Sequence, residues 1–149
     1  MTRIRRAQAG DMPAAAGIVN DWIDETPWMP RVHPPDDVIR FYRDVVFANQ
    51  RVWVAENDGR IVGLMALDGS MISALYLGQN ARRQGLGSQL IELAKQASAA
   101  ELTLWTFVAN RAAQQFYAVN GFQEVRRTDG DNEEGLPDIL FKWQPKAGA

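Results

Sequence analysis

The sequence of 149 residues contains no cysteine and only one histidine, His33. A chain without cysteine has no disulfide framework, no thiolate zinc site and no cysteine nucleophile, and a single histidine excludes a multi-histidine metal centre. We therefore expect no metal site. Any catalysis must use carboxylates, hydroxyls, amides or His33.

The sequence also has little excess charge and no long apolar run. Its 16 basic and 18 acidic side chains leave a formal net charge of −2, which offers little attraction to the phosphates of nucleic acid. No apolar stretch approaches the ~20 residues that a membrane helix needs, and residues 1–10 lack the apolar core of a secretory signal. We expect a cytoplasmic protein that binds neither nucleic acid nor membranes.

The length and composition are those of a single globular domain, with 46% hydrophobic and 23% charged residues. The last five residues contain too little apolar surface to order themselves. We predict one domain over residues 1–144 and a flexible tail over residues 145–149.

Apolar periodicity and turn residues predict the order of the strands and helices. Strands are expected over residues 3–7, 51–56, 60–67, 70–77, 102–108, 122–127 and 139–143. Helices are expected over residues 11–24, from residue 36 onward, and over residues 85–99 and 111–120, with Asp11 and Asn110 as caps. This order predicts an α/β fold with about four helices and a mixed, largely antiparallel sheet, in which the crossover over residues 70–108 creates one parallel pair.

Residues 82–88, Arg-Arg-Gln-Gly-Leu-Gly-Ser, lie at a predicted strand-to-helix junction. Backbone N–H groups and the positive end of a helix can hold a phosphate or pyrophosphate there. A dinucleotide fingerprint would need a third glycine where Leu90 stands, and a nucleoside triphosphate loop would need a Gly-Lys-Ser/Thr ending. On this segment alone, an anion site and a plain structural turn both remain open.

A second motif follows the next predicted strand, where residues 110–122 read Asn-Arg-Ala-Ala-Gln-Gln-Phe-Tyr-Ala-Val-Asn-Gly-Phe. The pair Arg-x-x-Gly-x-Gly and Asn-x-x-Ala-x-x-Phe-Tyr-x-x-x-Gly-Phe resembles the GCN5-related N-acetyltransferases (GNAT), and the order of elements agrees over most of the chain. Residues 70–95 and 102–122 carry the resemblance, whereas residues 11–50 match only in element type.

The resemblance implies the GNAT-like acyl-CoA N-acyltransferase fold, with acetyl-CoA as cosubstrate between the splayed parallel strands. It implies that backbone amides of the first motif bind the pyrophosphate, while the preceding strand and the second motif bind the pantetheine arm. The cofactor-binding residues implied in this way are Leu75, Leu77, Arg82, Arg83, Gln84, Gly85, Leu86, Gly87, Ser88, Asn110 and Phe116. Gln79 stands where many relatives have proline, so we expect the start of the loop to be less rigid.

Transfer of an acetyl group from a thioester to an amine needs a neutral nucleophile, a stabilised oxyanion and a proton for the leaving thiolate. The family places a tyrosine beside the thioester sulfur, which makes Tyr117 the expected catalytic acid. A tyrosine packed beside Phe116 is the alternative. A backbone N–H near Tyr76 or Leu77 is expected to meet the oxyanion.

The general base is not evident from the sequence. Residues 71–77 offer only Ser73 and Tyr76 as polar side chains, and an amine could also lose its proton through ordered water. The other candidates are Glu25, His33 and Glu56. Without cysteine, a thiol acyl-enzyme is excluded, which favours direct attack within a ternary complex.

Aromatic residues gather between the first two helices, a region that overhangs the acceptor pocket in relatives. Trp28 and His33 lie among prolines in a loop that does not otherwise need large rings, so we expect them to bind the acceptor; a loop plug or a subunit contact is the alternative. Trp22, at helical spacing from Ile18, is expected in the core. The acidic run over residues 129–134 could attract a cationic amine, although such runs are more typical of solvated loops.

These observations favour an acetyl-CoA-dependent N-acetyltransferase that acts on a primary amine. A small-molecule acceptor is favoured over a protein, and the expected partner is a small-molecule or peptide amine. The alternative is a catalytically silent acyl-CoA sensor of the same fold. The sequence leaves the oligomeric state open, and a homodimer is suggested by analogy alone.

Overall fold

Seven strands form one sheet in the order β1-β2-β3-β4-β5-β7-β6. The computed structural model describes residues 2–98 and 100–145 of the chain, so the predicted helix end at residue 99 and most of the predicted tail lie outside the described residues. The strands are β1 (Thr2–Arg6), β2 (Arg51–Asn57), β3 (Arg60–Asp68), β4 (Met71–Leu77), β5 (Leu102–Phe107), β6 (Gln123–Thr128) and β7 (Asp138–Trp143). Every pair is antiparallel except β4 and β5, which confirms the predicted mixed sheet.

The described residues form four helical segments, as the sequence predicts. They are α1 (Met12–Glu25), a segment in which α2 (Pro35–Phe41) continues through the π-helical turn η2 (Tyr42–Val46) into α3 (Phe47–Asn49), α4 (Leu86–Ala97) and α5 (Arg111–Val119). Two short 3₁₀ turns, η1 (Ala9–Asp11) and η3 (Gln79–Ala81), precede α1 and α4. No described helix is long and apolar enough to cross a membrane.

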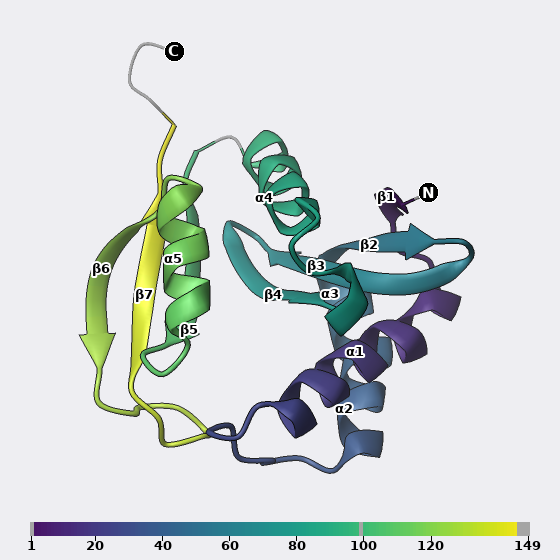
Figure 1. Cartoon of the computed structure of the whole chain (residues 1–149), viewed down its shortest axis with the longest axis horizontal. Helices are drawn as coiled ribbons and strands as arrows, with labels where there is room; N and C mark the ends of the chain where they lie inside the picture. The colour runs from purple at the N-terminus through teal and green to yellow at the C-terminus, as the bar shows by residue number, and fades with distance from the viewer. Residues whose placement is uncertain (1, 99, 146–149) are drawn as a thin grey trace.

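The helices cover both faces of the sheet and create two cores (Figure 1). Residues of α1, α2 and η2 pack on one face, around Val54 and Leu64. Residues of α4 pack on the other face around Met65 and Leu104, with Phe116 and Tyr117 of α5 against them.

A β-bulge in β4 decides which side chains face each core. Ala66 of β3 pairs with Ala74, but the next residue, Leu67, pairs with Ile72, so Ser73 is an extra residue in β4. The bulge breaks the alternation of the strand, and Ile72 packs in the core beneath α4 whereas Ala74 packs beneath α1. Beyond the bulge, Tyr76 therefore points to the α1 side.

The parallel strands β4 and β5 are joined at one end only. Met71 and Thr103 form their register pair, and Thr103 N donates to Ser70 O at 3.0 Å. From that point the two strands run apart (Figure 1). The split divides the sheet into a half that contains β1 to β4 and a half that contains β5, β7 and β6.

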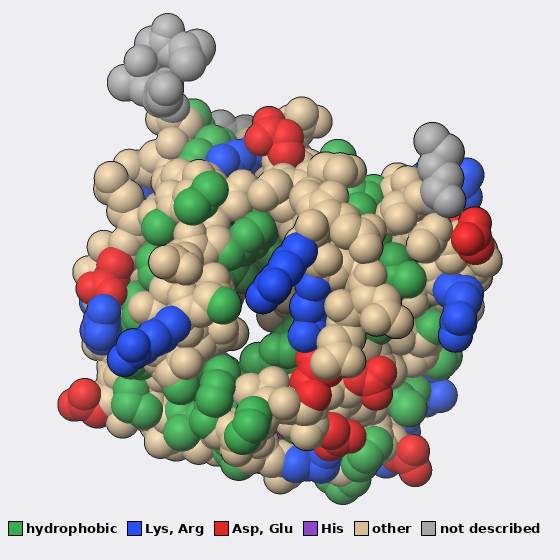
Figure 2. All heavy atoms as spheres, in the orientation of Figure 1, with side chains coloured by type: hydrophobic (Ala, Val, Ile, Leu, Met, Phe, Trp, Pro, Cys, Tyr) green, Lys and Arg blue, Asp and Glu red, His purple; other side chains and the backbone are tan. Residues whose placement is uncertain are grey.

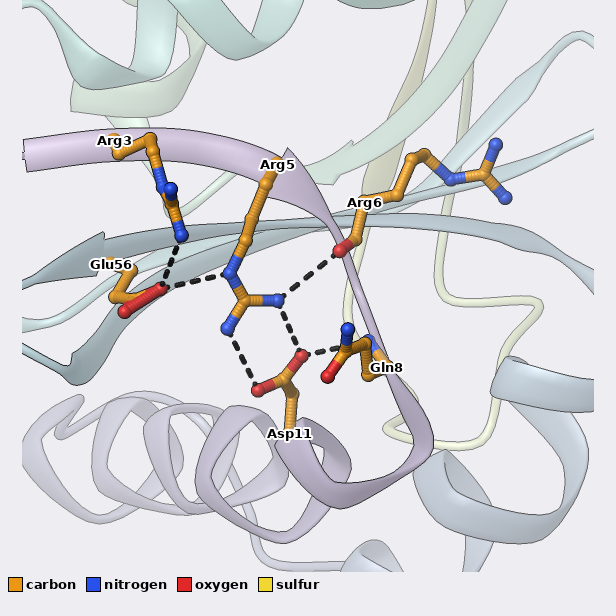
Figure 3. A network of polar contacts seen from close by, with 6 residues as sticks. All are labelled: Arg3, Arg5, Arg6, Gln8, Asp11 and Glu56. Atoms are coloured by element: carbon orange, nitrogen blue, oxygen red, sulfur yellow. Dashed lines mark hydrogen bonds and ion pairs between the residues drawn. The ribbon is translucent and has the colours of Figure 1, made fainter.

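An ion-pair network ties the edge of the sheet to the start of α1 (Figure 3). The Arg5 guanidinium donates to both carboxylate oxygens of Asp11, at 2.8 and 3.0 Å, and to Glu56 at 2.8 Å. These bonds lower the pKa of the Asp11 and Glu56 carboxyls. Asp11 is the N-cap residue of α1 and Pro13 lies in the first turn, as predicted, but the Asp11 carboxylate does not bond to the helix. It accepts from Gln8 N at 2.7 Å instead, and Pro13 has no N–H to offer.

Candidate active site

A cavity of about 570 Å³ lies where β4 and β5 part. Its walls include residues from both faces of β4: Leu75 and Leu77 on the α4 side, and Ala74 and Tyr76 on the α1 side. Figure 2 shows this hollow near the middle of the molecule, with Lys and Arg side chains at its rim. Because the strands have separated, one ligand can contact both faces of the sheet.

The first motif forms the loop at the start of α4. Arg83 has a φ of +63° and Gly85, the N-cap residue of α4, has a φ of +81°. Left-handed residues in such a loop turn successive backbone N–H groups toward one side, and the N-terminus of α4 adds its positive end. Arg82, Arg83 and Gly87 line the cavity, so this end of it suits an anion.

Arg82 also links β4 to α1. Its Nε donates to Leu77 O at 3.1 Å, and its Nη2 pairs with the Glu25 carboxylate. The guanidinium therefore holds the end of β4 against the end of α1, which is a positioning role that the motif alone did not indicate.

The two motifs meet at Gly87. A Cβ built on Gly87 would lie 2.9 Å from Phe116 Cζ and 3.1 Å from Phe116 Cε1, so the helix start and the α5 ring are in close contact. Asn110 begins α5 as predicted, because its Oδ1 accepts from Ala113 N at 3.1 Å. This leaves the Asn110 amide nitrogen as the donor that can reach a ligand in the cavity.

The remaining residues of the first motif contribute mainly backbone. The Leu86 side chain is buried, and Ser88 is exposed on the first turn of α4. Gln84 Nε2 donates to Asn80 O at 2.9 Å. Gln79 begins the 3₁₀ turn η3, in which Ala81 N donates to Gly78 O at 2.9 Å. A hydrogen-bonded turn therefore forms at the start of the loop, where Gln79 lies.

Tyr117 lines the cavity from α5 and packs among aromatic rings. Its ring centroid lies 5.2 Å from that of Phe116 and 5.8 Å from that of Phe122. Burial raises the pKa of Tyr117 above its ordinary value, and the nearby Tyr76 raises it further. Burial, with the charge of Glu134, raises the pKa of Tyr76 to about 12. Both phenols therefore keep their protons at neutral pH.

Of the two predicted acceptor residues, Trp28 lies beside rings that line the cavity, whereas His33 forms no hydrogen bond, ion pair or ring contact with a lining residue within the described part of the chain. Trp28 does not line it directly but packs between two rings that do, with centroids 5.8 Å from Trp22 and 5.7 Å from Phe107. His33 is 53% exposed, and its Nε2 lies 3.1 Å from Glu133 Oε2 in the loop between β6 and β7. Their role in binding the acceptor stays a prediction.

Sequence reasoning missed several residues of the cavity. The core interpretation of Trp22 is wrong, because its half-buried ring lines the cavity. The cavity is also lined by three residues of β5, Trp105, Thr106 and Phe107. Their position near the end of a strand predicted to pair in parallel could have indicated this role. Among the described residues, no three His, Asp or Glu side chains lie close enough together to hold a metal ion.

Comparison with known proteins agrees with this geometry. The family described as "Acetyltransferase (GNAT) domain" matches residues 48–124. The peptidyl-lysine N-acetyltransferase YiaC of Escherichia coli is 31% identical over 144 residues, which cover 94% of this chain and 95% of YiaC. The chain belongs to the GNAT acetyltransferases.

Solved structures of other proteins share the fold. YjaB of Escherichia coli, in its apo form, superposes with a TM-score of 0.77 at 25% identity and covers 100% of this chain and 99% of its own. The yncA protein of Salmonella typhimurium, solved with its cofactor acetyl-CoA, has a TM-score of 0.75 at 19% identity and covers 100% of this chain and 96% of its own. The predicted family, fold class and enzyme class are confirmed: this GNAT protein is an N-acetyltransferase.

Proposed function

We propose that this GNAT enzyme transfers the acetyl group of acetyl-CoA to a primary amine by direct attack in a ternary complex. The observation that carries the proposal is that one cavity is lined by three features: the loop at the start of α4, the parting strands β4 and β5, and the protonated Tyr117. The acetyl-CoA in the yncA structure supports the choice of cosubstrate.

In this proposal the pyrophosphate lies against the backbone amides of residues 83–88, where the charge of Arg83 also attracts it. The pantetheine arm lies in the split, beside the backbone of Leu75 and Leu77 and within reach of Asn110. Phe116 closes the far wall. The residues named here by their side chains or strand positions all line the cavity, namely Leu75, Leu77, Arg83, Asn110 and Phe116. The other residues of the loop would contribute only backbone amides.

The chemistry requires one bond to form and one to break. The neutral amine nitrogen attacks the thioester carbonyl carbon, and the carbon–sulfur bond then breaks to release the CoA thiolate. Tyr117 gives its proton to that sulfur and regains one from water, while the amine loses its proton to solvent. A backbone N–H near Tyr76 or Leu77 stabilises the oxyanion between these steps.

The acceptor is a primary amine in this proposal. The sequence favoured a small molecule, and the name of YiaC adds the lysine side chain of a peptide as a second candidate. Both carry the same reacting group, so the first experiment includes both.

The test is release of free CoA thiol from acetyl-CoA over a panel of small amines and peptides. The chain has no cysteine and so contributes no thiol background. Tyr117→Phe is expected to lower kcat by about 100-fold, the scale of general acid catalysis, while the Kd of acetyl-CoA stays the same. Tyr42→Phe, which removes a hydroxyl from the core on the α1 side, is the matched control.

Two outcomes would contradict the proposal. Unchanged kcat in Tyr117→Phe would remove the tyrosine from the acid role. Binding of acetyl-CoA without turnover of any amine would favour the silent acyl-CoA sensor instead.

A further inference from the structure

The helix α5 carries the second motif, yet the core holds it only lightly. It has nine residues, and none of them is fully buried. It lies on the same face of the sheet as α4, on the other side of the split between β4 and β5 (Figure 1). A segment with few buried apolar contacts moves easily unless other contacts hold it. The position of α5 therefore depends on the groups that bind its two ends.

Two side-chain donors bind α5 to its neighbours. Near its start, Gln114 Nε2 donates to Val108 O, just after β5, at 2.7 Å. At its other end, Lys95 Nζ of α4 donates to Asn120 O at 2.6 Å. Tyr117 lies midway between Gln114 and Asn120 in the sequence, so one donor holds the helix on each side of it.

Lys95 meets the end of α5 where a positive charge is most favourable. Asn120 is the C-cap residue of α5, and its carbonyl belongs to the negative end of the helix. The half-buried ammonium group also lies 5.1 Å from the centre of the Trp143 ring of β7, a cation–π contact. Lys95 therefore joins α4, α5 and β7 at one point.

The turn that Lys95 holds is also the turn that packs on Tyr117. Asn120 N donates to Tyr117 O at 3.1 Å, and Phe122 N donates to the same oxygen at 3.0 Å. The centroid of the Phe122 ring lies 5.8 Å from that of the Tyr117 ring. A shift of residues 120–122 would thus reach Tyr117 through its backbone and through its ring.

We propose that Lys95 is a positioning residue, which fixes the Tyr117 hydroxyl in the cavity by holding the last turn of α5. This inference rests on the proposed function, because it takes Tyr117 as the acid. Lys95 does not line the cavity, so it acts on the reaction only through other residues. A displacement of about 1 Å in a group that takes part in the chemistry can lower the rate about 100-fold.

A double-mutant cycle tests the inference. The turnover number kcat is measured for the wild type, Lys95→Met, Tyr117→Phe and the double variant, with an amine that the wild type acetylates. Methionine keeps an apolar stem but has no ammonium group, so kcat is expected to fall about tenfold. The Kd of acetyl-CoA should change by less than about twofold, because Asn110 lies at the other end of α5, which Gln114 still holds.

The double variant separates positioning from a general structural role. Its kcat is expected to equal that of Tyr117→Phe, because a residue that acts through the hydroxyl has nothing left to position once the hydroxyl is gone. Lys95→Arg keeps the charge and a donor and should restore most of the lost kcat. An unchanged kcat in Lys95→Met, or a double variant about tenfold below Tyr117→Phe, would overturn the inference.

Lys142→Met is the matched control. Lys142 Nζ lies 2.7 Å from Glu101 Oε2, and its neighbour Phe141 packs in the core, so Lys142 points to the face of β7 opposite α5. This variant also loses one lysine contact, but it should keep the wild-type kcat and Kd of acetyl-CoA. An equal fall of kcat in both lysine variants would assign the effect to stability and reject positioning.

A second measurement does not need turnover. The chain has three tyrosines, so tyrosine rings labelled with a stable carbon isotope give few NMR signals, and Tyr117→Phe assigns the signal of Tyr117 by its loss. In Lys95→Met this signal should shift or broaden, whereas that of Tyr42, in the core on the α1 side, should stay in place. If no amine is acetylated, or if Tyr117→Phe keeps the wild-type kcat, the proposed function fails, but a changed Tyr117 signal still supports the positioning by Lys95. An unchanged signal rejects it.

Discussion

Replacing Gly87 with alanine separates the fit of the cavity from the stability of its helix. Alanine in a helix is favoured over glycine by about 0.5–1 kcal/mol. At Gly87, however, the new Cβ would lie 2.9 Å from Phe116 Cζ, well inside the ~3.5–4.0 Å of a normal carbon contact, so the ring must move. Displacing a side chain from its rotamer costs about 0.5–1.5 kcal/mol, which cancels the gain.

Gly17 in α1 is the matched control, because a Cβ there meets nothing within 4 Å. Gly17→Ala is expected to raise the free energy of unfolding by about 0.5–1 kcal/mol, or Tm by about 1–4 °C for a chain of this size. Gly87→Ala is expected to leave Tm nearly unchanged and to raise the KM for acetyl-CoA at least threefold, since the methyl group and the displaced ring narrow the cavity.

Thermal unfolding followed by circular dichroism and the thiol-release assay measure the two effects. The reasoning is refuted if Gly87→Ala stabilises the protein as much as Gly17→Ala and keeps the wild-type KM for acetyl-CoA. That result would mean that Phe116 moves freely and does not limit the site.

Three further predictions concern charge and capping. Arg5 lowers the pKa of the Asp11 and Glu56 carboxyls in the folded state, so their contribution to the free energy of unfolding is fully present above the unfolded pKa values of ~4 and is lost as pH falls through the lower folded values. Chemical denaturation between pH 6 and 2 should show this loss of stability, and Arg5→Met should make the pH dependence smaller. Burial disfavours the phenolate of Tyr117 and so raises its pKa, and kcat at saturating substrate should therefore not fall between pH 8 and 10; a decline with a midpoint in that range would contradict the acid role. Asn110→Asp keeps the oxygen that caps α5 but removes the amide donor, so Tm should be maintained while the KM for acetyl-CoA rises. Asn110→Ala should raise the same KM and also lower the free energy of unfolding by about 1 kcal/mol. An unchanged KM in Asn110→Asp would limit this residue to capping.

Local signals made most of the fold predictable. The β-branched and apolar runs, the turn residues between them and the Asn110 cap are properties of short segments, and the structure forms the elements where these signals lie. The turn at the start of α4 was also predictable, because its glycines and arginines are adjacent in the chain.

The acceptor side was not predictable in the same way. The bulge at Ser73 carries no clear sequence signal, yet it decides that Tyr76 faces α1. Trp22 has the spacing of a core residue and becomes a cavity residue only because β4 and β5 part beneath it. The meeting of His33 with Glu133 joins segments whose separation in sequence hides their contact.

The single register pair between β4 and β5 has a mechanical consequence. Along most of β4, one side of the strand is an internal edge whose ladder is incomplete, because a single register pair, Met71 with Thr103, joins it to β5 in the described residues. On the proposed function, acetyl-CoA bound in that gap would form backbone hydrogen bonds with β4 that β5 does not form. Backbone amides in β4 should therefore exchange their hydrogens with solvent more slowly when acetyl-CoA is bound.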